Sequence, residues 1–148
     1  MSLHRGRLCP FQDAGRIESG KAAACALAGG ALGVVPFAAL SGSSAGLHEA
    51  LSILAAVASC ALFGVTYRYA VGSNPSNPHL KGGVVTAFGL VRAAAAADVM
   101  QLSSASGPFS VEVVAPAALF AGQSMLMFAF AATAIEAAFK QGFIKRVD

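Results

Sequence analysis

The sequence predicts an all-α integral membrane protein, a four-helix bundle with both chain ends on the same side of the membrane. Three observations lead to this prediction. The 148 residues are 56% hydrophobic and 11% charged, with a mean hydropathy of +0.67, whereas about 25% of the residues in an ordinary soluble domain are charged. Four apolar runs are each long enough to cross a hydrocarbon core of about 30 Å. The basic residues gather in the two terminal segments and in the central connection.

A polar, basic arm of residues 1–21 precedes the first expected span, residues 22–40. The arm lacks the apolar core of a secretory signal peptide, and the sequence leaves open whether a transit peptide has been removed ahead of it. Gly29 and Gly33 stand four residues apart in the span, a spacing that lets another helix approach closely. Pro36 is expected to kink or end the helix near Val35, because a proline inside a helix removes a backbone hydrogen bond.

The second expected span, residues 48–71, is apolar on all faces and closes with Tyr67, Arg68 and Tyr69. This order predicts an interface anchor, with the rings at headgroup level and the guanidinium reaching water. Two Asn-Pro pairs follow in the polar connection. They predict a turn, because the residue before a proline avoids helical geometry.

The third expected span, residues 82–103, carries Arg92 and Asp98 inside apolar sequence. Arg92 lies roughly 16 Å beyond Lys81 along a helix, near the middle of the membrane. An isolated charge at that depth is expensive, so this helix should face protein, a cofactor or a water-filled cavity. Arg92 and Asp98 are six residues apart and are not expected to pair within the helix.

The fourth expected span, residues 116–139, begins with Pro116 at a first-turn position. It is apolar apart from Gln123 and Glu136, and a basic tail of residues 141–148 follows it. The transmembrane domain therefore covers residues 22–140, between the arm and the tail.

The placement of Lys and Arg supports four crossings. Every Lys and Arg except Arg92 lies before the first span, in or beside the central connection, or after the fourth span. Under the positive-inside rule both termini and the central connection then face the cytoplasm or the stroma. Three crossings would break this alternation. The net charge of +3 is explained by this placement, and we expect no nucleic-acid partner.

No cluster of His, Asp or Glu at a common depth points to catalysis. We therefore expect no enzyme activity and no metal-ion site. Arg92 has two functional interpretations, binding an anionic group or the polar part of a cofactor between helices, or joining Asp98 on an ion path. A structural interpretation stands beside them, in which Arg92 pairs with Glu136 or with a carboxylate of another subunit. Side chains able to ligate a chlorophyll magnesium are His48, Glu49, Gln101, Gln123 and Glu136.

Two stretches, FGVTYRYAVG at residues 63–72 and LKGGVVTAFGLVR at residues 80–92, resemble a family of small integral membrane proteins from chloroplasts and cyanobacteria. The resemblance covers about a fifth of the chain, and Gly72 stands where that family has a basic residue. It implies a thylakoid or envelope location, of which we expect the chloroplast thylakoid membrane, and a role beside photosynthetic complexes.

These observations together predict a non-catalytic accessory subunit of a larger photosynthetic membrane complex of the photosystem type. Its partners would be other membrane subunits and the lipid bilayer, and its candidate ligands are chlorophyll, carotenoid or lipid. The first alternative is a small transporter or channel that uses Arg92 and Asp98, and the second is an isolated membrane enzyme.

Overall fold

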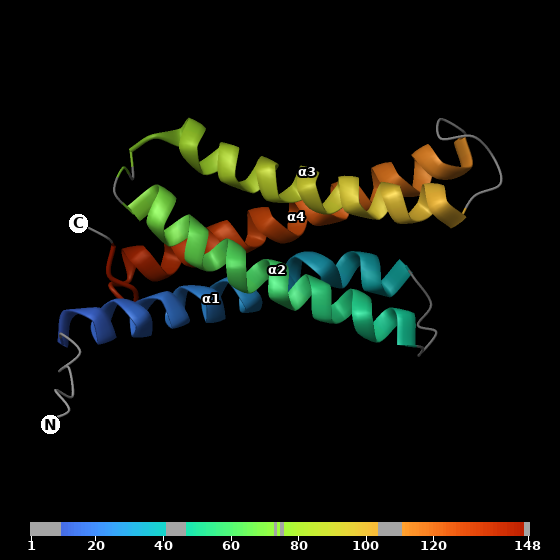
Figure 1. Cartoon of the computed structure of the whole chain (residues 1–148). Helices are drawn as coiled ribbons and strands as arrows, with labels where there is room; N and C mark the ends of the chain where they lie inside the picture. Colours follow the sequence, from blue (N-terminus) through green and yellow to red (C-terminus); the bar gives the residue numbers. More distant parts are fainter. Residues whose placement is uncertain (1–9, 41–46, 73, 75, 104–110, 147–148) are drawn as a thin grey trace, which may run out of the picture.

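The computed structural model describes residues 10–40, 47–72, 74, 76–103 and 111–146, with the side chains of 10–14, 36–40, 48–49, 100–103 and 112–113 left out. All regular structure in these residues is helical, as predicted. Four helices follow one another along the chain (Figure 1): α1 (Pro10–Leu40), α2 (Leu47–Gly72), α3 (Pro78–Ser103) and α4 (Val111–Lys140).

Three of the four helices are long and apolar enough to cross a membrane. The candidate spans are Ala50–Gly72, Pro78–Val99 and Val114–Lys140. Large apolar side chains on their outer faces are exposed, among them Leu54, Leu62, Val91 and Leu119. Such surfaces are unfavourable in water and favourable in lipid, so the chain has the properties of an integral membrane protein. α1 is not among the three; it contains the expected span 22–40, whose last five side chains lie outside the described residues.

α1 packs most extensively against α4, and small residues make this contact close. A Cβ atom at Gly29 would lie 2.7 Å from the Phe130 carbonyl oxygen, and one at Gly33 would lie 2.8 Å from the Met127 Cα. The Gly29/Gly33 spacing therefore brings two helix backbones together, as the sequence predicts. Gly64 of α2 makes a similar approach to the backbone of α1.

Aromatic rings fill the space between α2, α3 and α4. Phe63 is fully buried, and its ring centroid lies 5.4 Å from that of Tyr67, 5.4 Å from that of Phe88 and 5.0 Å from that of Phe128. These separations lie in the favourable range for aromatic pairs. The core of the described residues is thus nearest the end of the molecule where α2 finishes and α3 begins.

The helix bounds differ from the predicted spans in three places. α1 begins at Pro10, within the expected arm, and runs past Pro36 to Leu40, so Pro36 does not end the helix. α3 begins at Pro78 directly after the Asn-Pro turn, where the Asn77 side-chain oxygen accepts hydrogen bonds from two backbone N–H groups of the first turn. α4 begins at Val111, so Pro116 lies inside the helix and not in its first turn. Hydropathy indicates the part of a helix that can cross lipid. The helix itself extends into polar sequence wherever its backbone hydrogen bonds can still form.

The C-terminal segment is folded back onto the helices. Gly142 has a φ of 71°, and the Phe143 N–H donates to the Ala138 carbonyl at 3.0 Å. This is the hydrogen bond that closes a helix when glycine takes the left-handed conformation. Ile144 is buried, so the start of the basic tail is part of the packed structure.

Candidate functional site

A cavity of about 620 Å³ lies between the four helices, in the half of the molecule farther from the Asn-Pro turn. Figure 1 shows the α1–α2 pair and the α3–α4 pair diverging toward that end. Apolar side chains make up most of the lining, and four polar residues join them: Ser52, Arg92, Gln123 and Ser124. A volume in the range of about 300–1,000 Å³ with few polar groups is typical of small-molecule sites.

Arg92 is the charged residue of the cavity. It is half-buried, and its Nη1 donates a hydrogen bond to the Ser59 hydroxyl at 3.4 Å. The Ser59 hydroxyl in turn donates to the Ala55 carbonyl of its own helix. The guanidinium carbon lies 5.2 Å from the centroid of the Phe120 ring, within the distance at which a cation is attracted to a ring face. α2, α3 and α4 thus hold the guanidinium in place at the cavity.

No acidic side chain among the described residues forms an ion pair with Arg92. The structural interpretation in which Arg92 pairs with Glu136 is therefore not found, and a carboxylate of another subunit is not tested. Glu136 instead accepts from Lys81 at 3.0 Å and lies 3.9 Å from Arg146. Lys81 is eleven residues before Arg92 on α3, or roughly 16 Å along the helix, so one carboxylate cannot serve both cations.

Ser124 supplies a second polar group with an unused hydrogen-bonding capacity. It is 1% exposed, lines the cavity, and its hydroxyl has no partner among the described residues. A buried hydroxyl without a partner costs free energy. Gln123 is the neighbouring residue and lines the same cavity. The lining of this mainly apolar cavity therefore includes a guanidinium, an amide and two serine hydroxyls.

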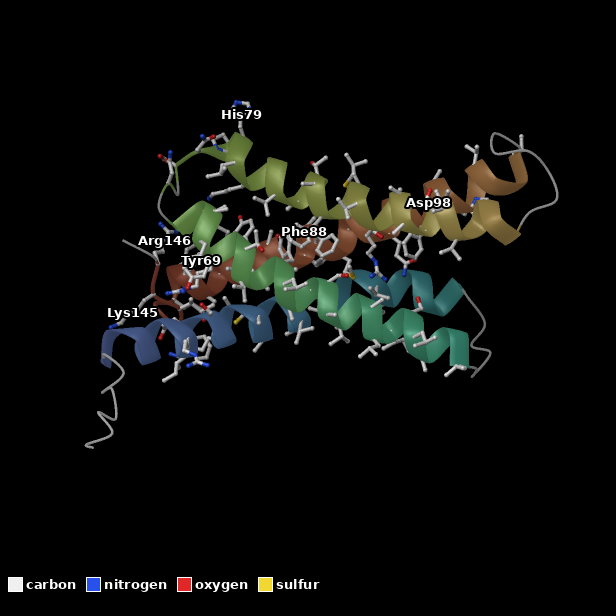
Figure 2. All side chains as sticks on the ribbon, in the orientation of Figure 1. Tyr69, His79, Phe88, Asp98, Lys145 and Arg146 are labelled. Carbon is white, nitrogen blue, oxygen red and sulfur yellow. The ribbon has the colours of Figure 1, made fainter. Side chains whose placement is uncertain are left out.

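The predicted site residues divide into three groups. Arg92 and Gln123 meet at the cavity. Glu136 belongs to an ion-pair cluster at the other end of α4. The side chains of His48, Glu49 and Gln101 lie outside the described residues. Asp98 is exposed near the far end of α3 (Figure 2) and does not line the cavity.

A second polar region surrounds the end of α2. Here the structure differs from the predicted interface anchor, in which the Arg68 guanidinium would reach water. Tyr69 is exposed, but Arg68 is 5% exposed and Tyr67 is buried. Arg68 donates from Nε to the Lys145 carbonyl at 3.1 Å and from Nη1 to the Ser19 hydroxyl at 3.0 Å. The guanidinium does not reach water because the start of α1 and the C-terminal segment cover this end of the helix. Figure 2 shows Tyr69, Lys145 and Arg146 gathered there.

Glu18 and Tyr67 complete this polar region. One Glu18 oxygen pairs with Lys21 at 2.9 Å, and the other accepts the Lys145 backbone N–H at 2.8 Å. The hydrogen bond from Lys21, and then that from Lys145, lower the pKa of Glu18 from its ordinary value. The Tyr67 hydroxyl donates to Glu136 at 3.1 Å. These contacts hold α1, α2, α4 and the C-terminal segment together, so the residues of this region have a structural role.

Two further features bear on metal binding and catalysis. The described residues contain no group of three or more His, Cys, Asp or Glu side chains able to hold a metal ion. Residues 42–46 read Gly-Ser-Ser-Ala-Gly, which matches the Gly-x-Ser-x-Gly pattern of α/β-hydrolases. That pattern needs a strand before its serine, whereas helix α1 ends two residues before the match, which itself lies outside the described residues.

Comparison of the chain with protein-family models, with curated proteins and with solved structures gave no match. The function must therefore be argued from the residues of this chain. Sequence reasoning singled out Arg92 and Gln123 as polar residues in apolar spans, but it passed over Ser59, Phe120 and Ser124. Small hydroxyls and phenylalanines are common in apolar helices, so only the packing shows that Phe120 and Ser124 line the cavity and that Ser59 contacts Arg92.

Proposed function

We propose that this chain is a non-catalytic integral membrane protein that acts as an accessory subunit of a larger membrane complex. The observation that carries the proposal is the incomplete covering of α3. This helix packs mainly on α4 and touches α2 little, and only 6% of its span is buried. A helix covered over so little of its surface has most of it free for lipid and for other subunits.

The outer face of α3 presents small residues to a neighbouring helix between larger apolar ones. Gly83, Ala87 and Ala94 are exposed there at helical spacing, together with Leu90 and Val91, and an added Cβ at Gly83 would meet no atom of this chain within 4 Å. Small residues on a membrane helix permit close approach of a neighbour. The proposed partner surface is therefore this face, called the α3 face below.

The α3 face can be tested by co-purification from native membranes. We expect the chain to migrate in a complex larger than itself, and Gly83→Leu to reduce the recovery of its partners. Gly122→Leu on α4 is the matched control, because Gly122 is also exposed with no atom within 4 Å of an added Cβ. A protein that migrates alone, or equal loss in both variants, would contradict the proposal.

The proposed topology is a four-helix bundle in which α1 crosses the membrane in addition to α2, α3 and α4. The start of α1, the Asn-Pro turn and the end of α4 lie at one end of the molecule (Figure 1), and Arg68, Lys81, Lys145 and Arg146 gather there. By the positive-inside rule this end would face the cytoplasm or the stroma. The proposal predicts that Ser76→Cys and Lys145→Cys, each in a background without native cysteines, react with an impermeant maleimide from the same side. Labelling from opposite sides would refute four crossings.

A photosystem-type complex in the chloroplast thylakoid is the finer form of the proposal, and it depends on the resemblance of residues 63–92. Pigment or lipid would then lie at the helix faces. Of the described candidate ligands for chlorophyll magnesium, Glu136 is engaged by two cations, which leaves Gln123. Absorbance of the purified native complex tests this form, and a colourless complex without photosynthetic subunits would exclude it.

A further inference from the structure

We infer that the cavity around Arg92 binds an anionic amphiphile, with its oxyanion on Arg92 and Ser124 and its acyl chain against the apolar lining. The inference rests on the membrane location in the proposed function, but it does not depend on partner subunits. The shared chemistry is a carboxylate or phosphate at the end of a single hydrocarbon chain.

The charge of the cavity is the first argument. A cation in a low-dielectric region is costly unless an anion or several acceptors compensate it. Among the described residues, Arg92 has one hydrogen-bond acceptor, at 3.4 Å, and no carboxylate partner. A ligand that carries an oxyanion supplies the missing charge, and the planar guanidinium fits a carboxylate or phosphate with two parallel hydrogen bonds.

The unpartnered hydroxyl is the second and independent argument. Ser124 is 1% exposed, lines the same cavity, and has no hydrogen-bond partner among the described residues. An oxyanion bound at the guanidinium could accept a hydrogen bond from this hydroxyl, and Gln123 adds an amide donor on the same helix. Arg92, Gln123 and Ser124 all line the cavity that would receive the oxyanion.

The apolar lining of the cavity indicates that the rest of the ligand is a hydrocarbon chain. Arg92 and Ser124 lie near the middle of α3 and α4, whereas the lining residues Leu51, Ile53 and Val99 lie near the start of α2 and the end of α3. These last three side chains are more than half exposed, so the cavity wall continues into the outer apolar surface of the protein. A hydrocarbon chain can therefore run from Arg92 past these residues, between α2 and α3, which touch each other little.

The experiment uses the purified full-length protein in detergent micelles with a fatty acid that carries a photoreactive diazirine. Oleate, lysophosphatidate and methyl oleate compete for labelling, and mass spectrometry locates the labelled peptides. We expect labels on the cavity-lining segments of α2, α3 and α4. We also expect at least about 10-fold weaker competition by the neutral ester, because it loses the charge-assisted hydrogen bonds.

Variants separate the cavity from general attraction to basic residues. Arg92→Gln should weaken oleate binding about 10-fold or more and leave methyl oleate unchanged, and Ser124→Ala should weaken oleate binding about 2- to 10-fold. Lys140→Gln is the matched control, because Lys140 is an exposed cation at the other end of the protein. Circular dichroism verifies folding, and the comparison of acid with ester in the unmodified protein needs no variant.

The outcomes are distinct. Stronger competition by oleate identifies a carboxylate ligand and stronger competition by lysophosphatidate a phosphate ligand, and both support the inference. Equal competition by acid and ester, labels outside the cavity, or an equal effect of Lys140→Gln overturns it. A protein that migrates alone in native membranes would refute the subunit proposal and leave this inference standing.

Discussion

The close contact between α1 and α4 makes a sharp prediction for Gly29→Ala. The new Cβ would lie 2.7 Å from the Phe130 carbonyl oxygen, 2.7 Å from the Ala134 Cβ and 3.0 Å from the Ala131 Cα. Unstrained contacts between carbon atoms lie at about 3.5–4.0 Å, and none of these atoms can rotate away. The two helices must therefore move apart along their most extensive contact.

The expected loss of unfolding free energy is compared with that of a control variant that carries the same Gly→Ala change elsewhere. Overpacking a core typically costs about 1–3 kcal/mol, while alanine gains up to about 1 kcal/mol of helix propensity over glycine. Gly122→Ala has the propensity gain but no clash, because an added Cβ there meets nothing within 4 Å. The difference in unfolding free energy between the two variants should therefore be about 1–3 kcal/mol.

Cys60 provides the assay. It is 3% exposed and its thiol is free, so in a Cys9→Ser, Cys25→Ser background a fluorescent maleimide reports unfolding during a thermal ramp. A difference of 2 kcal/mol corresponds to roughly 4–8 °C in the midpoint for a chain of this size. If Gly29→Ala melts at or above the temperature of Gly122→Ala, the backbone approach of α1 to α4 is wrong.

Three further predictions concern the polar end of the molecule. Arg68→Ala should destabilise the protein by about 2–4 kcal/mol because it removes two charged hydrogen bonds. Limited proteolysis of this variant should release the C-terminal segment. An unchanged melting temperature would contradict the burial of the guanidinium. The lowered pKa of Glu18 means that its carboxylate stabilises the fold above its ordinary pKa of about 4.5. This stability is lost as the pH falls through the lower folded-state pKa. In Glu18→Gln the melting temperature should therefore lose its dependence on pH in that range. A variant that keeps the full pH dependence would exclude this role for Glu18. Tyr67→Phe should cost about 0.5–1.5 kcal/mol for one hydrogen bond, measured by the same thermal ramp, whereas a larger loss would mean that the hydroxyl also holds another group.

Much of the fold follows from local sequence properties. Long apolar runs predicted four spans, three of which are helices able to cross a membrane, and the Asn-Pro pairs marked the turn before α3. The Gly29/Gly33 spacing predicted a close helix neighbour, although not that the neighbour is α4. Helix ends were less predictable, as at Pro10 and Pro116, because a helix continues wherever its polar side chains and backbone can be satisfied outside the apolar run.

The candidate site was only half visible in the sequence. Arg92 is conspicuous as a charge within an apolar span, and Gln123 as an amide in another. Ser124 and Phe120 have no such signal, since either residue is ordinary in a membrane helix. Their importance comes from the rotation of α4 about its axis, which turns them toward the same cavity.

By itself, the sequence determined the kind of protein, because hydropathy and charge act residue by residue and need no knowledge of neighbours. Only the tertiary structure decided the partners of each polar group. It placed Glu136 with Lys81 and not with Arg92, and it buried Arg68 beneath Ser19 and Lys145. The physical reason is that an ion pair or a hydrogen bond needs its atoms within about 4 Å. That distance depends on the depth, order and rotation of helices that lie far apart in the chain.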